Sequence, residues 1–85
     1  MTEERIKEII NTTLIEEFEI EPADIKATAN LFDDLELDSL DGIDLVLALE
    51  KRFSFKLEED VARQIRTVQD IYDVIIKVKD QVKDE

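Results

Sequence analysis

Residues 33–50 read DDLELDSLDGIDLVLALE and combine the strongest charge pattern of the chain with a strong helical pattern. Seven of these residues are acidic and none is basic. Ser39 lies at the junction between the acidic first part and the apolar run that follows. A hydroxyl at the start of a helix is either an N-cap, which accepts hydrogen bonds from free backbone amides, or a group open to other chemistry. The role of Ser39 is therefore the main question that the sequence raises.

The apolar residues after Ser39 recur at helical spacing and predict a helix over residues 39–53. We place its faces by turning about 100° per residue. The core face holds Gly42, Leu45, Val46, Leu49 and Phe53, and the opposite face holds Asp41, Asp44 and Lys51. Between these faces lies a second apolar group, named here the apolar shoulder: Leu40, Ile43 and Leu47. One neighbouring helix cannot cover both apolar surfaces, so we expect another segment or a partner to cover the surplus.

Three further segments have the pattern of helices. Residues 3–18 predict the first helix, which must end before Pro22. Residues 58–64 predict a short helix, and residues 68–82 predict the last one behind a capping pattern that begins at Thr67. We therefore predict an all-α four-helix bundle with a short third helix.

The connection over residues 19–38 is longer than an ordinary loop, so we expect it to be held against the core. Its candidate anchors are apolar: Ile20, Ile25, Leu31, Phe32 and Leu35. The chain contains no linker or repeat, and we expect residues 1–85 to form a single domain with a frayed tail after Val82.

The net charge of the chain is unevenly distributed. Its 85 residues carry a formal net charge of −12. Residues 1–50 contain 15 acidic and three basic residues, whereas residues 51–85 contain eight of each. The half that contains Ser39 therefore repels nucleic acid and anionic lipid, and it attracts basic protein surfaces. The longest apolar run is too short to span a membrane, and no signal-peptide pattern is present, so the sequence predicts a cytoplasmic protein.

The residue types present argue against catalysis by this chain. Histidine and cysteine are both absent, which removes the commonest general base and every thiolate. A nucleophilic serine needs a base beside it, and none is available at Ser39. An EF-hand loop starting at Asp34 would need glycine at position 39 and glutamate at position 45, and the chain has serine and leucine there. We therefore predict neither an enzyme nor a metal protein.

Taken residue by residue, a purely structural interpretation is coherent. Either Asp38 or Ser39 could be the N-cap, since both residue types are favoured there. The acidic residues could form a solvated helix face, and the apolar shoulder could be ordinary core. Judged on Asp38, Ser39 and Leu40 alone, the helix-cap interpretation is favoured, because motifs of three residues recur freely.

A longer match changes this balance. Residues 31–53, LFDDLELDSLDGIDLVLALEKRF, and residues 66–75, RTVQDIYDVI, resemble the acyl carrier proteins of fatty-acid and polyketide synthesis. Members of that family have a phenylalanine, a short acidic loop, Asp-Ser-Leu, a helix of alternating acids and aliphatics, and a Thr-Val start to the last helix. The order and spacing of these parts match from about Ile20 to Ile76.

The resemblance implies that a phosphopantetheinyl transferase attaches 4′-phosphopantetheine to Ser39. The thiol of this group would carry acyl groups as thioesters, in fatty-acid, lipid or polyketide synthesis. Partners would be acyl-transfer, ketosynthase or acyl-activating enzymes with basic docking surfaces, and the carrier would be a monomer. The residues implied in partner recognition are Asp38, Leu40, Asp41, Ile43, Asp44, Leu47 and Glu50, and the candidate liners of an acyl pocket are Val46, Phe53, Ile65 and Ile71.

The chain departs from the common family pattern at several positions. Glu36 replaces a glycine three residues before the serine, so we expect a different bend there. Lys51 and Arg52 stand where acids are common, and Arg63 adds a base to the third helix. These bases would repel some partners of a general carrier and favour a specialised one.

Three alternatives remain open. Peptidyl carriers and D-alanyl carriers share the attachment chemistry, although peptidyl carriers usually have glycine where Leu37 stands. From a different class, the chain could be an unmodified acidic helical adaptor that binds basic proteins.

Overall fold

The structure is a computed structural model and describes residues 1–83. Its elements are α1 (Glu3–Phe18), a 3₁₀ turn (Pro22–Asp24), α2 (Ser39–Phe53), α3 (Glu59–Arg63) and α4 (Val68–Lys77). The described residues contain four α-helices and, apart from one isolated bridge between Asn30 and Thr67, no β-structure. The predicted all-α fold with a short third helix is confirmed. None of the helices in residues 1–83 is long and apolar enough to cross a membrane.

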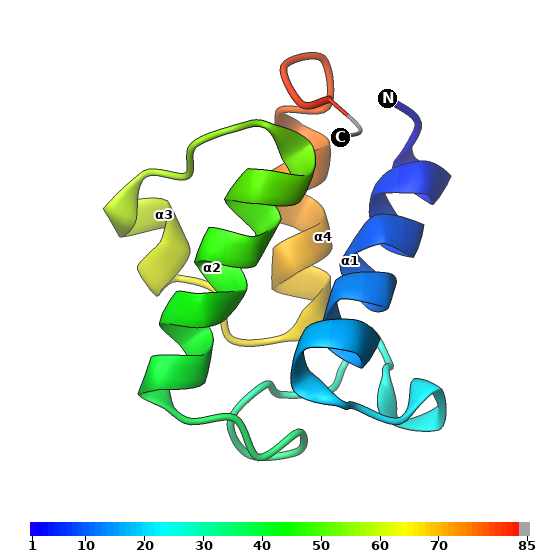
Figure 1. Cartoon of the computed structure of the whole chain (residues 1–85), viewed down its shortest axis with the longest axis vertical. Helices are drawn as coiled ribbons and strands as arrows, with labels where there is room; N and C mark the ends of the chain where they lie inside the picture. Colours follow the sequence, from blue (N-terminus) through cyan, green and yellow to red (C-terminus); the bar gives the residue numbers. More distant parts are fainter. Residues whose placement is uncertain (84–85) are drawn as a thin grey trace.

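Helices α1, α2 and α4 form the body of the bundle, and α3 lies beside α2 at its edge (Figure 1). Helix α1 packs against both α2 and α4. The start of α2 lies at one end of the bundle, and the N-terminus and the segment after α4 lie at the other (Figure 1). The largest fully buried aliphatic and aromatic side chains come from α1, α2, α4 and the long connection: Ile6, Ile10, Leu14, Leu31, Leu45, Leu49, Phe53, Val68, Ile71 and Ile75.

Local caps explain why α1 occupies its predicted residues. The Thr2 side chain accepts a hydrogen bond from the Arg5 amide, so it caps the first turn as its residue type favours. The helix ends at Phe18, and the C-cap residue Glu19 has the left-handed backbone conformation (φ 56°). That conformation turns the chain away from the helix axis ahead of Pro22.

The long connection between α1 and α2 is held to the start of α4 by backbone hydrogen bonds. The Leu31 amide donates to the Arg66 carbonyl at 2.8 Å, and the Val68 amide donates to the Ala29 carbonyl at 3.1 Å. Leu31 is buried among the core side chains, as is Leu37 nearer to α2. The part of the connection around Ala29 and Leu31 is therefore held against the start of α4, and this contact fixes the position of the chain before it enters α2.

The last helix is shorter than predicted. It ends at Lys77, and the prediction that it continues to residue 82 is wrong. The amides of Val78 and Lys79 donate to carbonyls three residues earlier, which tightens the chain into turns. These turns bring Val82 into the core at 5% exposure, and the Lys83 amide donates to the Phe53 carbonyl at 2.8 Å. The predicted fraying after Val82 therefore does not apply to the Lys83 backbone, and residues 84–85 lie outside the described residues.

Candidate functional site

The N-cap of α2 is Asp38. Its Oδ1 accepts the Asp41 amide at 2.8 Å, and Asp41 Oδ2 accepts the Asp38 amide at 3.1 Å. This reciprocal pair is a capping box, in which two free amides at the helix start find partners within the same turn. Asp38 has the extended backbone that a cap requires, with φ −103° and ψ −177°. The sequence left open whether Asp38 or Ser39 is the cap, and the structure places Asp38 there.

Ser39 is the first residue of α2 and is not needed as its cap. Its side chain is exposed, and its hydroxyl makes no hydrogen bond within residues 1–83. Backbone amides and the helix dipole favour negative charge at this end of a helix. A phosphate bonded to the Ser39 oxygen would therefore meet a favourable local field, in spite of the acidic neighbours.

The loop before Ser39 contains one residue with left-handed backbone conformation. Glu36 has φ 58°, which glycine adopts more easily than other residues. The next residue, Leu37, is buried, and its amide donates to the Leu31 carbonyl at 3.0 Å. Glu36 therefore adopts the backbone conformation that a glycine would favour at this position. The replacement of glycine by glutamate thus does not by itself require the loop to bend differently.

The apolar shoulder faces solvent. Leu40, Ile43 and Leu47 are 71%, 59% and 57% exposed, and they are the large exposed apolar side chains of the described chain. The long connection does not cover them. Of the two outcomes that the helix geometry allowed, the structure thus excludes burial of the shoulder by another segment of residues 1–83.

The acidic residues of α2 differ in how far their carboxylates are engaged. Asp44 is exposed and has no hydrogen-bond or ion-pair partner within residues 1–83. Asp38 and Asp41 each use one carboxylate oxygen in the capping box. Glu50 is half-buried, and its Oε2 accepts the Leu57 amide at 2.8 Å. Asp44 is therefore the acid most readily available to another molecule.

A groove of about 640 Å³ lies between α2 and α3 and reaches Ser39. Its lining is mainly apolar and comes from the long connection, α2, the α2–α3 connection and the α3 region. At the α2 start Phe32 lines it, and the Phe32 ring lies 3.7 Å from the point that a β-carbon on Gly42 would occupy. Its apolar lining includes Leu45, Val46, Leu57, Ala62 and Ile65.

Two of the four predicted acyl-pocket residues lie on this groove and two do not. Val46 and Ile65 line it, whereas Phe53 and Ile71 are fully buried in the helical core. The sequence analysis did not single out Leu57, which is 7% exposed and forms part of the groove wall. No sequence pattern marks that residue, because it lies in the connection between α2 and α3.

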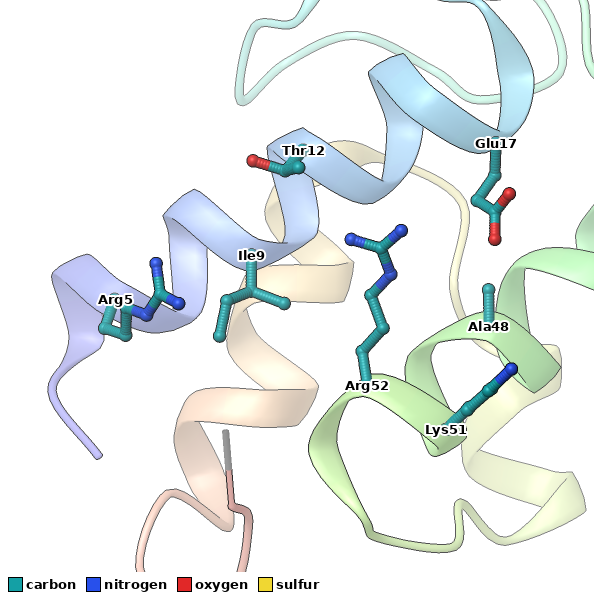
Figure 2. A pocket seen from close by; sticks show the side chains of 7 residues that line it. All are labelled: Arg5, Ile9, Thr12, Glu17, Ala48, Lys51 and Arg52. Atoms are coloured by element: carbon teal, nitrogen blue, oxygen red, sulfur yellow. The ribbon is translucent and has the colours of Figure 1, made fainter. Parts of the chain in front are cut away.

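A second cavity of about 390 Å³ lies between α1 and α2 (Figure 2). Arg52 extends from α2 toward α1 there, and its Nη2 lies 2.9 Å from Glu16 Oε1. Lys51 is exposed at the same cavity. Arg63 also has a carboxylate partner, Glu59, in its own helix α3. Of the three bases that depart from the family pattern, Lys51 alone has no carboxylate partner within residues 1–83.

Comparison with known proteins agrees with this geometry. Residues 6–75 match a family model described as a phosphopantetheine attachment site. Acyl carrier proteins of Chlamydia trachomatis serovars L2, D and A are each 33% identical to this chain over 66 residues, which cover 78% of this chain and 86% of each relative. The chain therefore belongs to the acyl carrier protein family.

Proteins of this family are carriers that bear a covalently attached 4′-phosphopantetheine and interact with acyl-transfer and synthase enzymes. The described residues fit such a group, because an exposed hydroxyl without a hydrogen-bond partner stands at a helix N-terminus above an apolar groove. Once attached, the group supplies a thiol, which this cysteine-free chain lacks.

Proposed function

We propose that Ser39 is the attachment point of 4′-phosphopantetheine and that the chain carries acyl groups as thioesters between enzymes. The observation that carries this proposal is the division of roles at the α2 start. Asp38 supplies the cap, so the Ser39 hydroxyl has no structural hydrogen bond to lose. Modification by a transferase therefore leaves the helix start intact.

The modification is a phosphoryl transfer from coenzyme A. The Ser39 oxygen would attack the phosphorus that bears the pantetheine arm, a phosphodiester bond would form, and adenosine 3′,5′-bisphosphate would leave with the pyrophosphate oxygen. The serine proton would go to a base of the transferase, since the chain has no histidine and the nearest carboxylates belong to the cap. The chain is thus a substrate in this step.

We assign the apolar shoulder and Asp44 to the docking of partner enzymes. The shoulder presents three apolar side chains on the helix that begins with Ser39, and Asp44 is an accessible carboxylate among them. Apolar contact at the centre with charge at the rim is the usual composition of a protein interface. Asp38, Leu40 and Asp41, nearest to Ser39, would contact the modifying transferase.

The groove between α2 and α3 would shelter part of an acyl chain. It is mainly apolar, it reaches Ser39, and its volume of about 640 Å³ falls within the usual range of ligand sites. Val46 and Ile65 are the predicted residues that support this role, because both line it. Phe53 and Ile71 could contribute only if the core opened.

We propose that this chain serves a specialised branch of fatty-acid, lipid or polyketide synthesis. We propose that it acts there as a monomer. Lys51 supports this specialised role, since it adds an uncompensated positive charge at the end of α2 remote from Ser39. An efficient exchange of this chain for a general carrier in fatty-acid elongation would contradict it.

The test is an intact-mass measurement after incubation with coenzyme A and a promiscuous phosphopantetheinyl transferase. We expect a gain of one phosphopantetheine in the unaltered chain and none in Ser39→Ala. Thr12→Ala is the matched control, because it removes a hydroxyl from α1 and leaves both Ser39 and the proposed docking surface in place. A chain that gains no mass would remove the proposed carrier function in favour of an unmodified adaptor. A Ser39→Ala variant that still gains it would show that the group is attached to another residue.

A further inference from the structure

The connection between α2 and α3, residues 54–58, forms one wall of the groove. Leu57 contributes an almost fully buried side chain to that wall, and Lys56 lines the groove beside it. The connection contains no helix, so its position depends on the hydrogen bonds of its backbone amides.

Three of these amides donate to a single residue, Glu50. The Ser54 amide donates to the Glu50 carbonyl as α2 ends in left-handed conformation, and the Phe55 amide donates to the same carbonyl at 3.1 Å. The Leu57 amide donates to the Glu50 side chain, at 2.8 Å from Oε2. Glu50 thus holds the connection twice, once through its backbone and once through its carboxylate.

The side-chain bond is the one that fixes the wall. A hydrogen bond from an amide to an ionised carboxylate is stronger than one between neutral groups. Leu57 is 7% exposed and Glu50 is half-buried, so water competes less well for this bond than at the helix surface. Without Oε2 the Leu57 amide would have no acceptor among residues 1–83.

This use of the carboxylate separates Glu50 from the other acids of α2. Asp44 is exposed and has no partner, whereas Glu50 lines the groove and has one oxygen engaged with the backbone. The family resemblance implied that both acids take part in partner recognition. The contact with the Leu57 amide gives Glu50 a structural role that Asp44 does not have.

We infer that Glu50 is a positioning residue for the acyl groove: its carboxylate fastens the α2–α3 connection through the Leu57 amide and so keeps the wall closed over the cargo. The effect on the cargo rests on the proposed carrier function, and the fastening of the wall does not. The role requires an oxygen acceptor at the end of the side chain and does not require its negative charge to face a partner.

Two substitutions separate these requirements. Glu50→Gln keeps a side chain of the same length with an oxygen acceptor and removes the charge. Glu50→Met keeps a similar length and a good helix-forming residue but removes the oxygen acceptor. Asp44→Asn is the matched control, since it removes one charge from the same helix at a residue that bonds nothing. Glu50→Ala is a second variant without an acceptor, for use if the methionine variant does not fold.

The first measurement is native-state hydrogen exchange of the Leu57 amide in the unmodified chain, with the Leu31 amide as an internal reference. We expect Glu50→Met to accelerate Leu57 exchange by about ten- to a hundredfold, the ratio that corresponds to loss of a hydrogen bond to a charged group. We expect Glu50→Gln to remain within about fivefold of the unaltered chain, because a neutral acceptor replaces a charged one. Asp44→Asn should change neither amide.

Three results would overturn the inference. Leu57 exchange that is unchanged in Glu50→Met would show that the bond does not hold the wall. Equal acceleration in Glu50→Gln and Glu50→Met would show that charge, not the acceptor, matters. Acceleration of Leu31 to the same extent as Leu57 would show a general loss of stability in place of a local opening.

The second measurement uses chain loaded with octanoyl-phosphopantetheine and follows cleavage of the thioester by hydroxylamine. Cleavage should be severalfold faster in Glu50→Met than in Glu50→Gln, because an opened wall exposes the cargo. If Ser39 is not modified with phosphopantetheine, the thioester measurement fails together with the proposed function. The exchange result on the unmodified chain still decides whether Glu50 fastens the wall.

Discussion

Replacing Asp38 by alanine should destabilise the folded chain, whereas replacing Ser39 by alanine should leave its stability nearly unchanged. Asp38→Ala removes the side-chain bond to the Asp41 amide, and loss of an N-cap of this kind costs about 1 kcal/mol. It also removes a negative charge from the positive end of the α2 dipole, which contributes about 0.3–1 kcal/mol at an exposed site. The expected loss is therefore about 1–2 kcal/mol. Ser39→Ala removes a hydroxyl without a partner, so a change within about 0.5 kcal/mol is expected.

Urea denaturation followed by circular dichroism measures both free energies of unfolding, since a single domain of this size usually unfolds in one transition. The same loss should lower the melting temperature of Asp38→Ala by about 4–16 °C, at roughly 4–8 °C for each kcal/mol. Asp38→Ser is the matched control, because serine is also a good N-cap and should recover most of the loss. A Ser39→Ala variant that loses as much stability as Asp38→Ala would refute the division between cap and attachment point.

Two further predictions concern the core. Phe53→Ala should lower the free energy of unfolding by about 3–5 kcal/mol, because the ring is 0% exposed at the end of α2, and a loss below about 1 kcal/mol in urea denaturation would contradict its burial. Burial raises the pKa of Tyr72 above its ordinary value of 10.0, although a hydrogen bond to Asn11 lowers it in part, so the folded chain retains the phenolic proton longer than the unfolded chain. This contribution to stability should be complete below about pH 10 and should be lost as the pH rises through the higher pKa of the folded state. Melting curves across that range should show a smaller fall in melting temperature for Tyr72→Phe than for the unaltered chain.

The bounds of α1 and α2 could be predicted because they depend on interactions within a few residues. Thr2 and Asp38 are good caps wherever they precede a helical run, and the residue before Pro22 resists helical geometry. The position of the apolar shoulder on α2 also follows from the sequence, since the angular position of a side chain on a helix is fixed by its number. Its exposure does not, because it depends on the path of the long connection. The failure at the end of α4 has the opposite cause. Val82 leaves the helical pattern because it packs into a core whose position depends on other helices.

The candidate site divides in the same way. The proposed attachment residue, Ser39, and the charge around it follow from the motif and from the family resemblance. The groove does not, because Leu57, Ala62 and Ile65 meet α2 only after the α2–α3 connection has taken its path. Phe53 and Ile71 have the residue types of a lipid pocket, yet they belong to the core of the bundle.

The sequence by itself determined the helices, the acidic half of the chain and a serine at the start of the second helix. Only the tertiary structure decided that Asp38 takes the cap and leaves the Ser39 hydroxyl free. It also decided that Glu50, one acid among several in the sequence, holds the Leu57 amide. The physical reason is that a hydrogen bond requires a donor and an acceptor in the right geometry. At Asp38 that geometry comes from the extended backbone ahead of the first turn of α2, and at Glu50 it comes from the path of the α2–α3 connection.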